Sequence, residues 1–393
     1  MPSLSAGLLG VVLLARHGDR LEFFQDPLTY NPSRTLLTPL GTVQESQLGN
    51  FLQNTYIASG SPSAIVNISF PLADVDQLLV RADAAGEGEV IISSIGALIQ
   101  GLYPPTSDFN ITLANGSTIV GAGGGYQFIP VQSAEPDDDI TLNSFTSCPN
   151  FDQHTAAFYA SPQFQQRTQE AAPFLAAVAP FVDDRSTNFT NMFNIFDFIN
   201  VQNTHNATYH DALPPTFVEQ AYDLASFHED GVFSDVSADG IGNVAIRTIF
   251  PSIFSSLQRV ANASDPLKFA IDGISYKPFI SFFNITAATV DRTGQGDFES
   301  LFGLVEYASA LALEVHAPSS SGGSSEPFIT VKFKNGTDSS LRTVALGRFG
   351  SNATSIPLST FVNTLEFAAI NSTAQWCAAC NQQSLRGCAA CIA

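Results

Sequence analysis

Basic residues are scarce in this chain. Only 16 of its 393 residues are lysine or arginine, against 36 aspartates and glutamates, and the formal net charge at pH 7 is −20. Proteins that bind nucleic acid or an anionic membrane surface need a patch of basic side chains to neutralise phosphates. The composition therefore excludes nucleic acid and membranes as partners. It also means that a phosphate site must gather several of the few cations in one place.

Long apolar runs are also missing. No segment reaches the roughly 20 residues that a membrane-spanning helix requires. The hydrophobic content is nevertheless 45%, and only 13% of residues are charged, so the chain can bury a large core. The first 15 residues lack the basic segment of a signal peptide, and their apolar run leads directly into a charged motif. We therefore expect them to belong to the mature fold.

Sequons for N-glycosylation, in contrast, are frequent. Ten of the 22 asparagines are followed by x-Ser or x-Thr. An excess of this pattern is typical of secreted proteins that carry N-linked glycans. We therefore predict a secreted, extracellular glycoprotein. The ten sequon asparagines are Asn67, Asn110, Asn115, Asn188, Asn206, Asn262, Asn284, Asn335, Asn352 and Asn371.

The five cysteines form a second pattern. Cys377, Cys380, Cys388 and Cys391 give a CxxC-x7-CxxC sequence, which in an intracellular protein suggests a zinc site. Seven residues between the two pairs are few for a zinc ribbon, and the sequons indicate an oxidising compartment, where cysteines form disulfides. We predict disulfides and no metal, with Cys148 either free or bonded to the C-terminal tail.

The most informative segment is an apolar run that ends in a cluster of charges. Residues 8–15 carry no polar side chain, which is typical of a strand buried on both faces. The next five residues are RHGDR (16–20). In α/β sheets, ligands bind beyond the carboxyl ends of strands. Two guanidinium groups suit phosphate oxygens, and a neutral imidazole between them can attack phosphorus.

This motif resembles the RHGxR signature of the histidine phosphatase superfamily. Further segments resemble its acid phosphatase/phytase branch, in particular secreted fungal members, and occur in the expected order. The resemblance implies an α/β fold: a mixed, mostly parallel sheet flanked by helices, phosphoglycerate-mutase-like, with an inserted, mainly helical cap. The α/β domain would comprise residues 1–105 and 246–393, and the cap residues 106–245. The segments are TPLGTVQESQLGNFL (38–52), LLVRAD (78–83), QGLYPP (100–105), FIPVQ (128–132) and CPNFD (148–152).

The resemblance also implies a mechanism. His17 would be the nucleophile that forms a phosphohistidine, while Arg16, Arg20 and Arg81 would bind the phosphate oxygens. No cofactor is needed, and the partner would be a phosphorylated small-molecule substrate. A second strand, predicted over residues 76–81, ends at Arg81. The Arg81 side chain can therefore reach the same edge of the sheet.

The second motif of the branch is incomplete. A His-Asp pair, whose aspartate is the general acid, normally follows a strand and opens a helix. The segment LKFAIDGISYKPFISFFNI (267–285) has the required apolar pattern, but Ser275 and Tyr276 stand in place of the pair. An alternative register places Ile271 and Asp272 there instead. The histidine is missing in both registers.

A missing acid matters because general acid catalysis contributes about 10²- to 10⁴-fold to the rate. Asp19, Asp83 and Asp272 are candidate replacement acids. Two functions therefore stay open. One is a secreted acid phosphatase-like phosphomonoesterase with weak or altered activity. The other is an inactive pseudophosphatase that binds a phosphorylated or anionic ligand.

The remaining histidines are weaker candidates. His154, His205, His210 and His316 lie in polar or helical surroundings, and none has the spacing of a metal site. His228 belongs to the sequence His-Glu-Asp in the predicted cap, where a structural histidine near the end of a helix is the favoured interpretation.

Apolar spacing supports this organisation. It predicts a helix over residues 38–52 and a second helix over residues 90–101. The apolar face of the first helix would be lined by Leu40, Val43, Leu48, Phe51 and Leu52. Alternating segments at 327–334 and 341–349, joined by a turn sequence, predict a β-hairpin.

Overall fold

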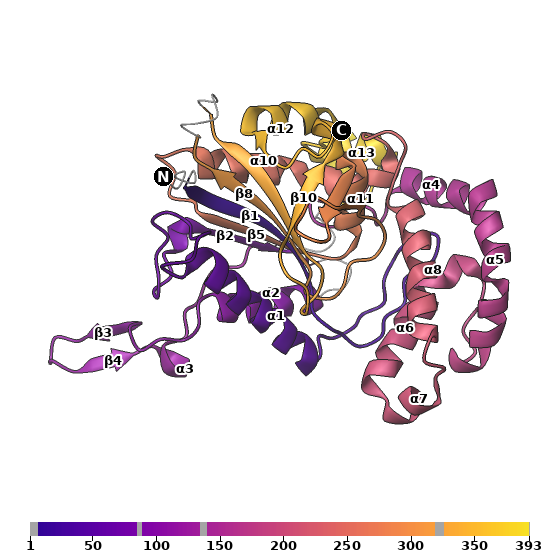
Figure 1. The fold of residues 1–393 in the computed structure, drawn as a ribbon, viewed down its shortest axis with the longest axis horizontal. Coiled ribbons are helices and arrows are strands. Elements are labelled where there is room, and N and C mark those ends of the chain that lie inside the picture. Colours follow the sequence, from indigo (N-terminus) through magenta and orange to yellow (C-terminus); the bar gives the residue numbers. More distant parts are fainter. Residues whose placement is uncertain (1–6, 85–88, 134–139, 319–325, 393) are drawn as a thin grey trace.

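The computed structural model describes residues 7–84, 89–133, 140–318 and 326–392, and a mixed sheet forms its centre (Figure 1). The strands of this sheet are β1 (Leu8–Arg16), β2 (Leu78–Ala82), β5 (Phe269–Ile274), β6 (Ala288–Asp291), β7 (Phe298–Ser300), β8 (Ala310–His316), β9 (Phe328–Lys334), β10 (Arg342–Leu346) and β11 (Ile356–Pro357). Among the described residues their order is β2-β5-β1-β8-β9-β10-β6-β7, with β11 beside β9. A separate hairpin consists of β3 (Asn110–Thr112) and β4 (Thr118–Val120).

β1 lies inside the sheet, as its unbroken apolar sequence predicts. It pairs in parallel with β5, where Arg16 is opposite Ile274, and antiparallel with β8. β2 is parallel to the other edge of β5, with Ala82 opposite Gly273. The carboxyl ends of β1, β5 and β2 therefore meet at one edge of the sheet, where α/β proteins bind ligands.

The predicted mixed sheet flanked by helices is confirmed. Its parallel part is smaller than predicted, because within the described residues only β2, β5 and β1 pair in parallel and the other pairs are antiparallel. The predicted hairpin is present as β9 and β10, in which Val331 is opposite Val344. The fold class thus follows the sequence, while the balance of strand directions does not.

Helices cover both faces of the sheet. Val11 and Leu13 of β1 share a core with α1 (Pro39–Leu52) and α2 (Glu89–Leu102). Val12 and Leu14 point to the opposite face, where α10 (Phe250–Ala261) and α12 (Leu358–Leu365) pack. Both faces of β1 therefore lie in hydrophobic cores, which explains why the strand has no polar side chain before its last residue.

The predicted apolar face of α1 is confirmed in its second half. Leu48 and Leu52 are buried, whereas Leu40 and Val43 in the first half are exposed. The buried face also includes Gly49, where a Cβ atom would collide with the carbonyl of Leu98 in α2. The two helices approach so closely there that only glycine fits at their contact.

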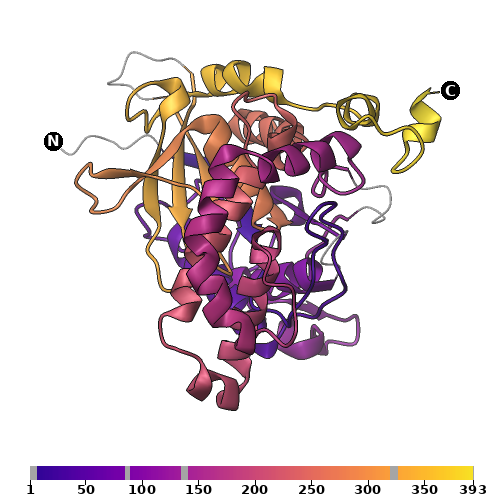
Figure 2. The ribbon, with the colours of Figure 1, turned by 90° about the vertical axis from the view of Figure 1, so that its right-hand side faces the viewer.

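Five further helices form a lobe beside the sheet, which we call the helical lobe (Figures 1 and 2). They are α4 (Pro149–Tyr159), α5 (Pro162–Val178), α6 (Met192–His205), α7 (Ala207–Ala212) and α8 (Phe217–Val232). The β3–β4 hairpin projects from the opposite side of the molecule (Figure 1). The other helices are α3 (Ala122–Gly125), α9 (Val244–Arg247), α11 (Lys277–Thr286), α13 (Thr373–Cys380) and α14 (Cys388–Ile392). No helix of the described residues is long and apolar enough to cross a membrane.

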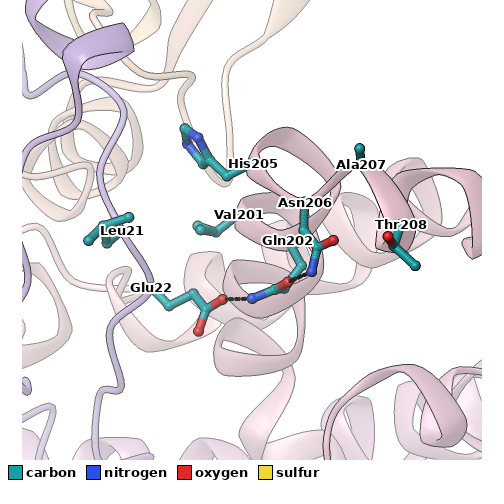
Figure 3. Close-up of a pocket in the computed structure, with 8 residues that line it drawn as sticks. All are labelled: Leu21, Glu22, Val201, Gln202, His205, Asn206, Ala207 and Thr208. Atoms are coloured by element: carbon teal, nitrogen blue, oxygen red, sulfur yellow. Dashed lines mark hydrogen bonds between the residues drawn. The ribbon is translucent and has the colours of Figure 1, made fainter.

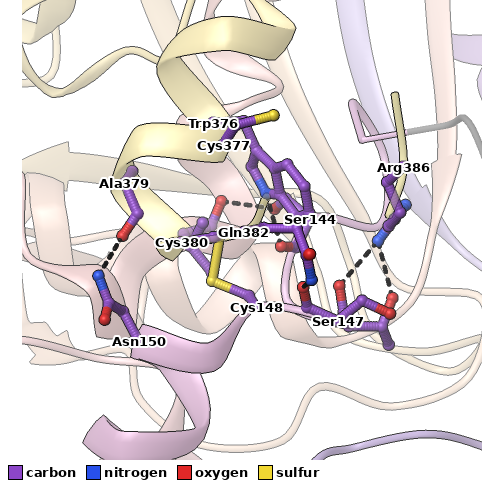
Figure 4. Close-up of a disulfide and its surroundings, with 12 residues drawn as sticks. Ser144, Ser147, Cys148, Asn150, Trp376, Cys377, Ala379, Cys380, Gln382 and Arg386 are labelled. Carbon is purple, nitrogen blue, oxygen red and sulfur yellow. Dashed lines mark hydrogen bonds between the residues drawn. A yellow bond between two sulfur atoms is a disulfide. The ribbon is translucent and has the colours of Figure 1, made fainter. Parts of the chain in front are cut away.

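Two disulfides hold the C-terminal tail. Cys148, just before α4, bonds Cys380 (Figure 4). Cys377 bonds Cys388. One disulfide thus links the two CxxC sequences, and the other attaches Cys148 to the tail. The buried indole of Trp376 adds to this attachment by donating to the carbonyl of Ser144 at 2.9 Å.

The disulfides predict a specific peptide map. Digestion without reduction should release Cys148 linked to Cys380 and Cys377 linked to Cys388, with Cys391 as the free thiol. The double variant Cys148→Ser/Cys380→Ser should lower the free energy of unfolding by about 2–4 kcal/mol, because the bond closes a long loop in the unfolded chain.

Cys391→Ser is the matched control, since it removes an exposed thiol without breaking a disulfide. Its unfolding in urea should match that of the wild type. Four free thiols in the native protein, or a Cys377–Cys380 crosslink, would contradict the assignment.

Candidate active site

The RHGDR motif forms a loop directly after β1, at the edge where the parallel strands end. The His17 side chain is only 1% exposed, and its Nδ1 lies 2.8 Å from the carbonyl oxygen of Gly18. A carbonyl oxygen only accepts hydrogen bonds, so Nδ1 carries the proton. In the neutral ring Nε2 then keeps the lone pair, as a nucleophile requires.

Two helices hold this loop in place. A Cβ atom on Gly18 would collide with the carbonyl of Gly41 in α1. The backbone N–H of Asp19 donates to Oε1 of Gln44 at 2.7 Å, and that of Gly18 donates to Oγ of Ser94 in α2 at 3.1 Å. The position of the nucleophile is therefore set by backbone contacts with α1 and α2.

The aromatic ring of Tyr307 lies close to three side chains of the motif. The ring centroid of Tyr307 lies 4.5 Å from the Arg16 guanidinium carbon, 5.9 Å from that of Arg20, and 5.6 Å from the His17 ring. Burial raises the pKa of the Tyr307 phenol, and Arg20 opposes this effect only in part. The phenol therefore stays neutral at acid and neutral pH and can donate a hydrogen bond.

Arg20 is bound by the helical lobe. Its Nη2 lies 2.7 Å from Oδ1 of Asp197 in α6, and both side chains are almost completely buried. The other carboxylate oxygen of Asp197 accepts from the backbone N–H of Phe23 at 3.2 Å. The predicted phosphate ligand Arg20 therefore already balances one carboxylate.

The second strand brings Arg81 to the same edge, next to two of the candidate acids. Arg81 lies opposite Asp272 in the pairing of β2 with β5, and their side chains are 3.4 Å apart. The guanidinium also donates to Oγ1 of Thr141 at 2.8 Å. Asp83 accepts from Nδ2 of Asn143 at 3.3 Å. Both carboxyl groups therefore already have partners at this edge of the sheet.

Ser275 and Tyr276 occupy the turn between β5 and α11, and both are buried. The Tyr276 hydroxyl donates to Oε2 of Glu229 in α8 at 2.6 Å and accepts from Nε2 of Gln25 at 3.0 Å. Tyr276 thus links the turn to the helical lobe. Neither side chain can serve as an acid at low pH, since serine hardly ionises and tyrosine has a pKa near 10.

His228 belongs to the same buried network. Its Nδ1 lies 2.7 Å from Oε1 of Glu229, and its Nε2 lies 3.1 Å from the carbonyl oxygen of Thr190. Both nitrogens thus lie within hydrogen-bond distance of an oxygen atom, which fixes the orientation of the ring. Tyr30 also donates to Glu229, at 2.8 Å. His228 therefore has the structural role that its sequence context favours.

Asp19, the candidate acid within the motif, bonds His205, which the sequence made only a weak candidate for the site. Nε2 of His205, the last residue of α6, lies 2.7 Å from Oδ2 of Asp19, and the Thr38 hydroxyl donates to the same oxygen. A sequence signal exists, because the polar residues Asp197 and His205 lie eight positions apart on one face of α6. This face binds the motif loop.

Glu45 is a further residue that the sequence analysis missed. It lies on the buried face of α1, one turn after the glycine that contacts the motif loop. Neither carboxyl oxygen has a hydrogen-bond partner among the described residues. Burial raises the pKa of Glu45 well above its ordinary value, although Arg16 opposes the shift. Burial therefore favours the neutral form of Glu45, close to the charges of the site.

A cavity of about 530 Å³ lies between the motif loop and the helical lobe (Figure 3). It is lined by Leu21, Glu22, Val201, Gln202, His205, Asn206, Ala207 and Thr208. Within the described residues no lysine or arginine lines this cavity. Glu22 accepts a hydrogen bond from Gln202 across it.

Known proteins share both sequence and fold with the chain, although no protein-family model matches it. It is 25% identical to lysosomal acid phosphatase of Rattus norvegicus over 237 residues, which are 58% of this chain and 51% of that protein. The chain thus spans about half the length of this curated relative.

Solved structures match over a longer range. Klebsiella sp ASR1 phytase superposes with a TM-score of 0.62 at 14% identity, covering 93% of this chain and 96% of the phytase. Hafnia alvei phytase in complex with myo-inositol hexakis sulphate gives 0.61 at 13% identity, covering 96% and 99%. At these identities the match shows a common fold. Together with the sequence relative, it supports the resemblance to the acid phosphatase/phytase branch of the histidine phosphatase superfamily.

The burial of Glu45 predicts an unusual pH dependence of stability. The folded state binds a proton at Glu45 more tightly than the unfolded state, whose pKa is the ordinary value of 4.5. The tighter proton binding adds to the free energy of unfolding. This stabilisation is complete below pH 4.5 and is lost as the pH rises toward the folded-state pKa. Each unit of pKa difference corresponds to about 1.4 kcal/mol. Glu45→Gln should therefore stabilise the protein at pH 7 relative to the wild type, but hardly at pH 4.

Urea unfolding of both proteins at pH 4 and pH 7 measures this difference. Glu306→Gln is a control, because Glu306 is exposed. An equal effect of Glu45→Gln at the two pH values would show that Glu45 is ionised in the folded protein.

Proposed function

We propose that the chain is a secreted phosphomonoesterase of the histidine acid phosphatase type, with altered acid catalysis. The observation that carries this proposal is the RHGDR loop at the carboxyl edge of the parallel strands, with the Nδ1 proton of His17 held by Gly18. The names of the sequence relative and of the matching structures, which are an acid phosphatase and phytases, support the same chemistry.

The proposed reaction has two steps. Nε2 of His17 attacks phosphorus, and the ester oxygen leaves; water then hydrolyses the phosphohistidine. Arg16 lies beside His17 and would neutralise the phosphate oxygens, with Arg20 and Arg81 as further ligands. Tyr307, which contacts the same side chains, would donate a hydrogen bond to the phosphate.

A binding protein is the second candidate function. In such a pseudophosphatase the pocket would capture a phosphorylated or anionic ligand without turnover. Two observations favour it: Arg20 is paired with Asp197, and Tyr276 is bound to Glu229 where the branch has its His-Asp pair. Both features fix the pocket rather than supply a proton.

Secretion and N-glycosylation belong to the proposal as well. All ten sequon asparagines are exposed, whereas seven of the other twelve asparagines are not. Exposure is a requirement for carrying a glycan in the folded protein. The two disulfides fit an extracellular or lumenal compartment.

The central test is the nucleophile. The wild type should hydrolyse an activated aryl phosphate at acid pH, and His17→Ala should reduce kcat by about 10³-fold or more. His210→Ala is the matched control, because the His210 ring is exposed and its Nδ1 lies 3.1 Å from the carbonyl oxygen of Asn203. Equal rates for the wild type and His17→Ala would overturn the enzyme proposal. Phosphate binding by calorimetry without product release would then support the binding protein.

Glycosylation can be tested on protein secreted from a eukaryotic host. Its mass should exceed that of the polypeptide, and enzymatic removal of N-glycans should return it to the polypeptide mass. Peptide mapping should then find converted asparagines at sequon positions and none at Asn143, which is buried and not in a sequon. A secreted protein with the unmodified polypeptide mass would contradict the assignment.

A further inference from the structure

We propose that His205, held by Asp19, donates the proton to the leaving group, and that the cavity beside it receives an uncharged alcohol. The proposal rests on the phosphomonoesterase function proposed above. It assigns the acid step, for which the turn at Ser275 and Tyr276 offers no side chain, to a residue of the helical lobe.

The geometry is that of an oriented imidazole. Nε2 of His205 lies 2.7 Å from a carboxylate oxygen of Asp19, which the Thr38 hydroxyl also approaches. Asp19 is almost completely buried, whereas 30% of the His205 side chain is exposed. The carboxylate thus holds the Nε2 proton and orients the ring, and Nδ1 is the nitrogen able to transfer a proton. Within the described part of the chain, no residue bonds to Nδ1.

The dyad lies next to the proposed phosphate site. Asp19 is two residues from His17 in the same loop, and its neighbour Arg20 is bound to Asp197 of α6. α1 and α2 hold the loop on one side, and Tyr307 covers the motif side chains. The cavity beside α6 begins at Leu21, directly after the motif. A phosphate held by the motif would therefore direct its ester group toward His205.

The proton balance of the step is complete. As the bond from His17 Nε2 to phosphorus forms, the bond from phosphorus to the ester oxygen breaks, and that oxygen keeps the electron pair. It takes the proton from Nδ1 of the His205 imidazolium and leaves as a neutral alcohol. Water then attacks the phosphohistidine and returns a proton to Nδ1, while His17 regains its lone pair and inorganic phosphate leaves.

Charged groups surround His205. Asp19 contacts the ring, and Glu22 lines the same cavity, where Arg185 lies 3.8 Å from Glu22. Arg20 lies beyond Asp19 and is balanced by Asp197. The ring is therefore oriented by one carboxylate, that of Asp19, whereas His210, on the following helix, faces the carbonyl of Asn203.

The cavity also limits the class of substrate. A ligand with several phosphates needs several cations, and no described lysine or arginine lines this cavity. Gln202 and Thr208 instead offer an amide and a hydroxyl group, which match the hydroxyls of a sugar or polyol. The cavity therefore suits a monophosphate ester of an uncharged alcohol.

The acid role is tested with two substrates of different leaving-group pKa. His205→Asn should reduce kcat/KM for an alkyl phosphate such as a sugar monophosphate by about 10²-fold or more, but hardly affect an activated aryl phosphate. Asp19→Asn should show the same selectivity with a smaller effect, and the acid limb of the pH profile should change in both variants. His210→Asn is the control and should match the wild type.

The outcomes separate the two proposals. A wild type as inactive as His17→Ala overturns the phosphatase function and this inference with it. An active wild type in which His205→Asn affects both substrates equally, or neither, overturns only the role of His205.

The assignment of the substrate class is tested by adding a positive charge to the lining of the cavity. The wild type should prefer the sugar monophosphate to inositol hexakisphosphate by about tenfold or more in kcat/KM, and Thr208→Lys should narrow that preference. Thr208→Met is the control, because it removes the same sequon at Asn206 without adding a cation. A wild type that prefers the hexakisphosphate would overturn the assignment of the substrate class.

Discussion

The buried ion pair between Arg20 and Asp197 connects the two parts of the molecule. Arg20 belongs to the loop that follows the central strand, and Asp197 to the helical lobe, and water reaches neither side chain to any extent. Removing one partner of such a pair leaves an uncompensated buried charge, which costs about 3–5 kcal/mol. The position of the lobe relative to the sheet edge, and hence the cavity between them, depends on this contact.

The ion pair also shows how the few cations of this acidic protein are neutralised or covered at the sheet edge. The three arginines have different arrangements: Arg20 is paired with Asp197, Arg81 with Asp272, and Arg16 packs on aromatic rings. Among the described residues, no carboxylate lies within ion-pair distance of Arg16. An incoming phosphate would meet its least compensated charge directly beside His17.

Local patterns in the sequence predicted the centre of the fold well. The apolar run before RHGDR and the segment around residues 267–285 identified β1, β5 and α11, because burial on both faces leaves a clear composition. The apolar pattern of α1 identified Leu48 and Leu52 but not Gly49, since contact between two helix backbones selects glycine at that point. Tyr307 was missed and His205 was only a weak candidate, because their importance arises when distant segments meet at the motif loop.

The central place of β1 affects how the protein can be synthesised. β1 is the first strand of the sheet to leave the ribosome, but its partners are β5 and β8, and Val11 pairs with Phe269. At 5–20 residues per second, roughly 10 to 50 seconds pass before that partner is made. During this time the most apolar strand lacks its sheet neighbours, so chaperones that shield nascent apolar segments would determine the yield of folded protein.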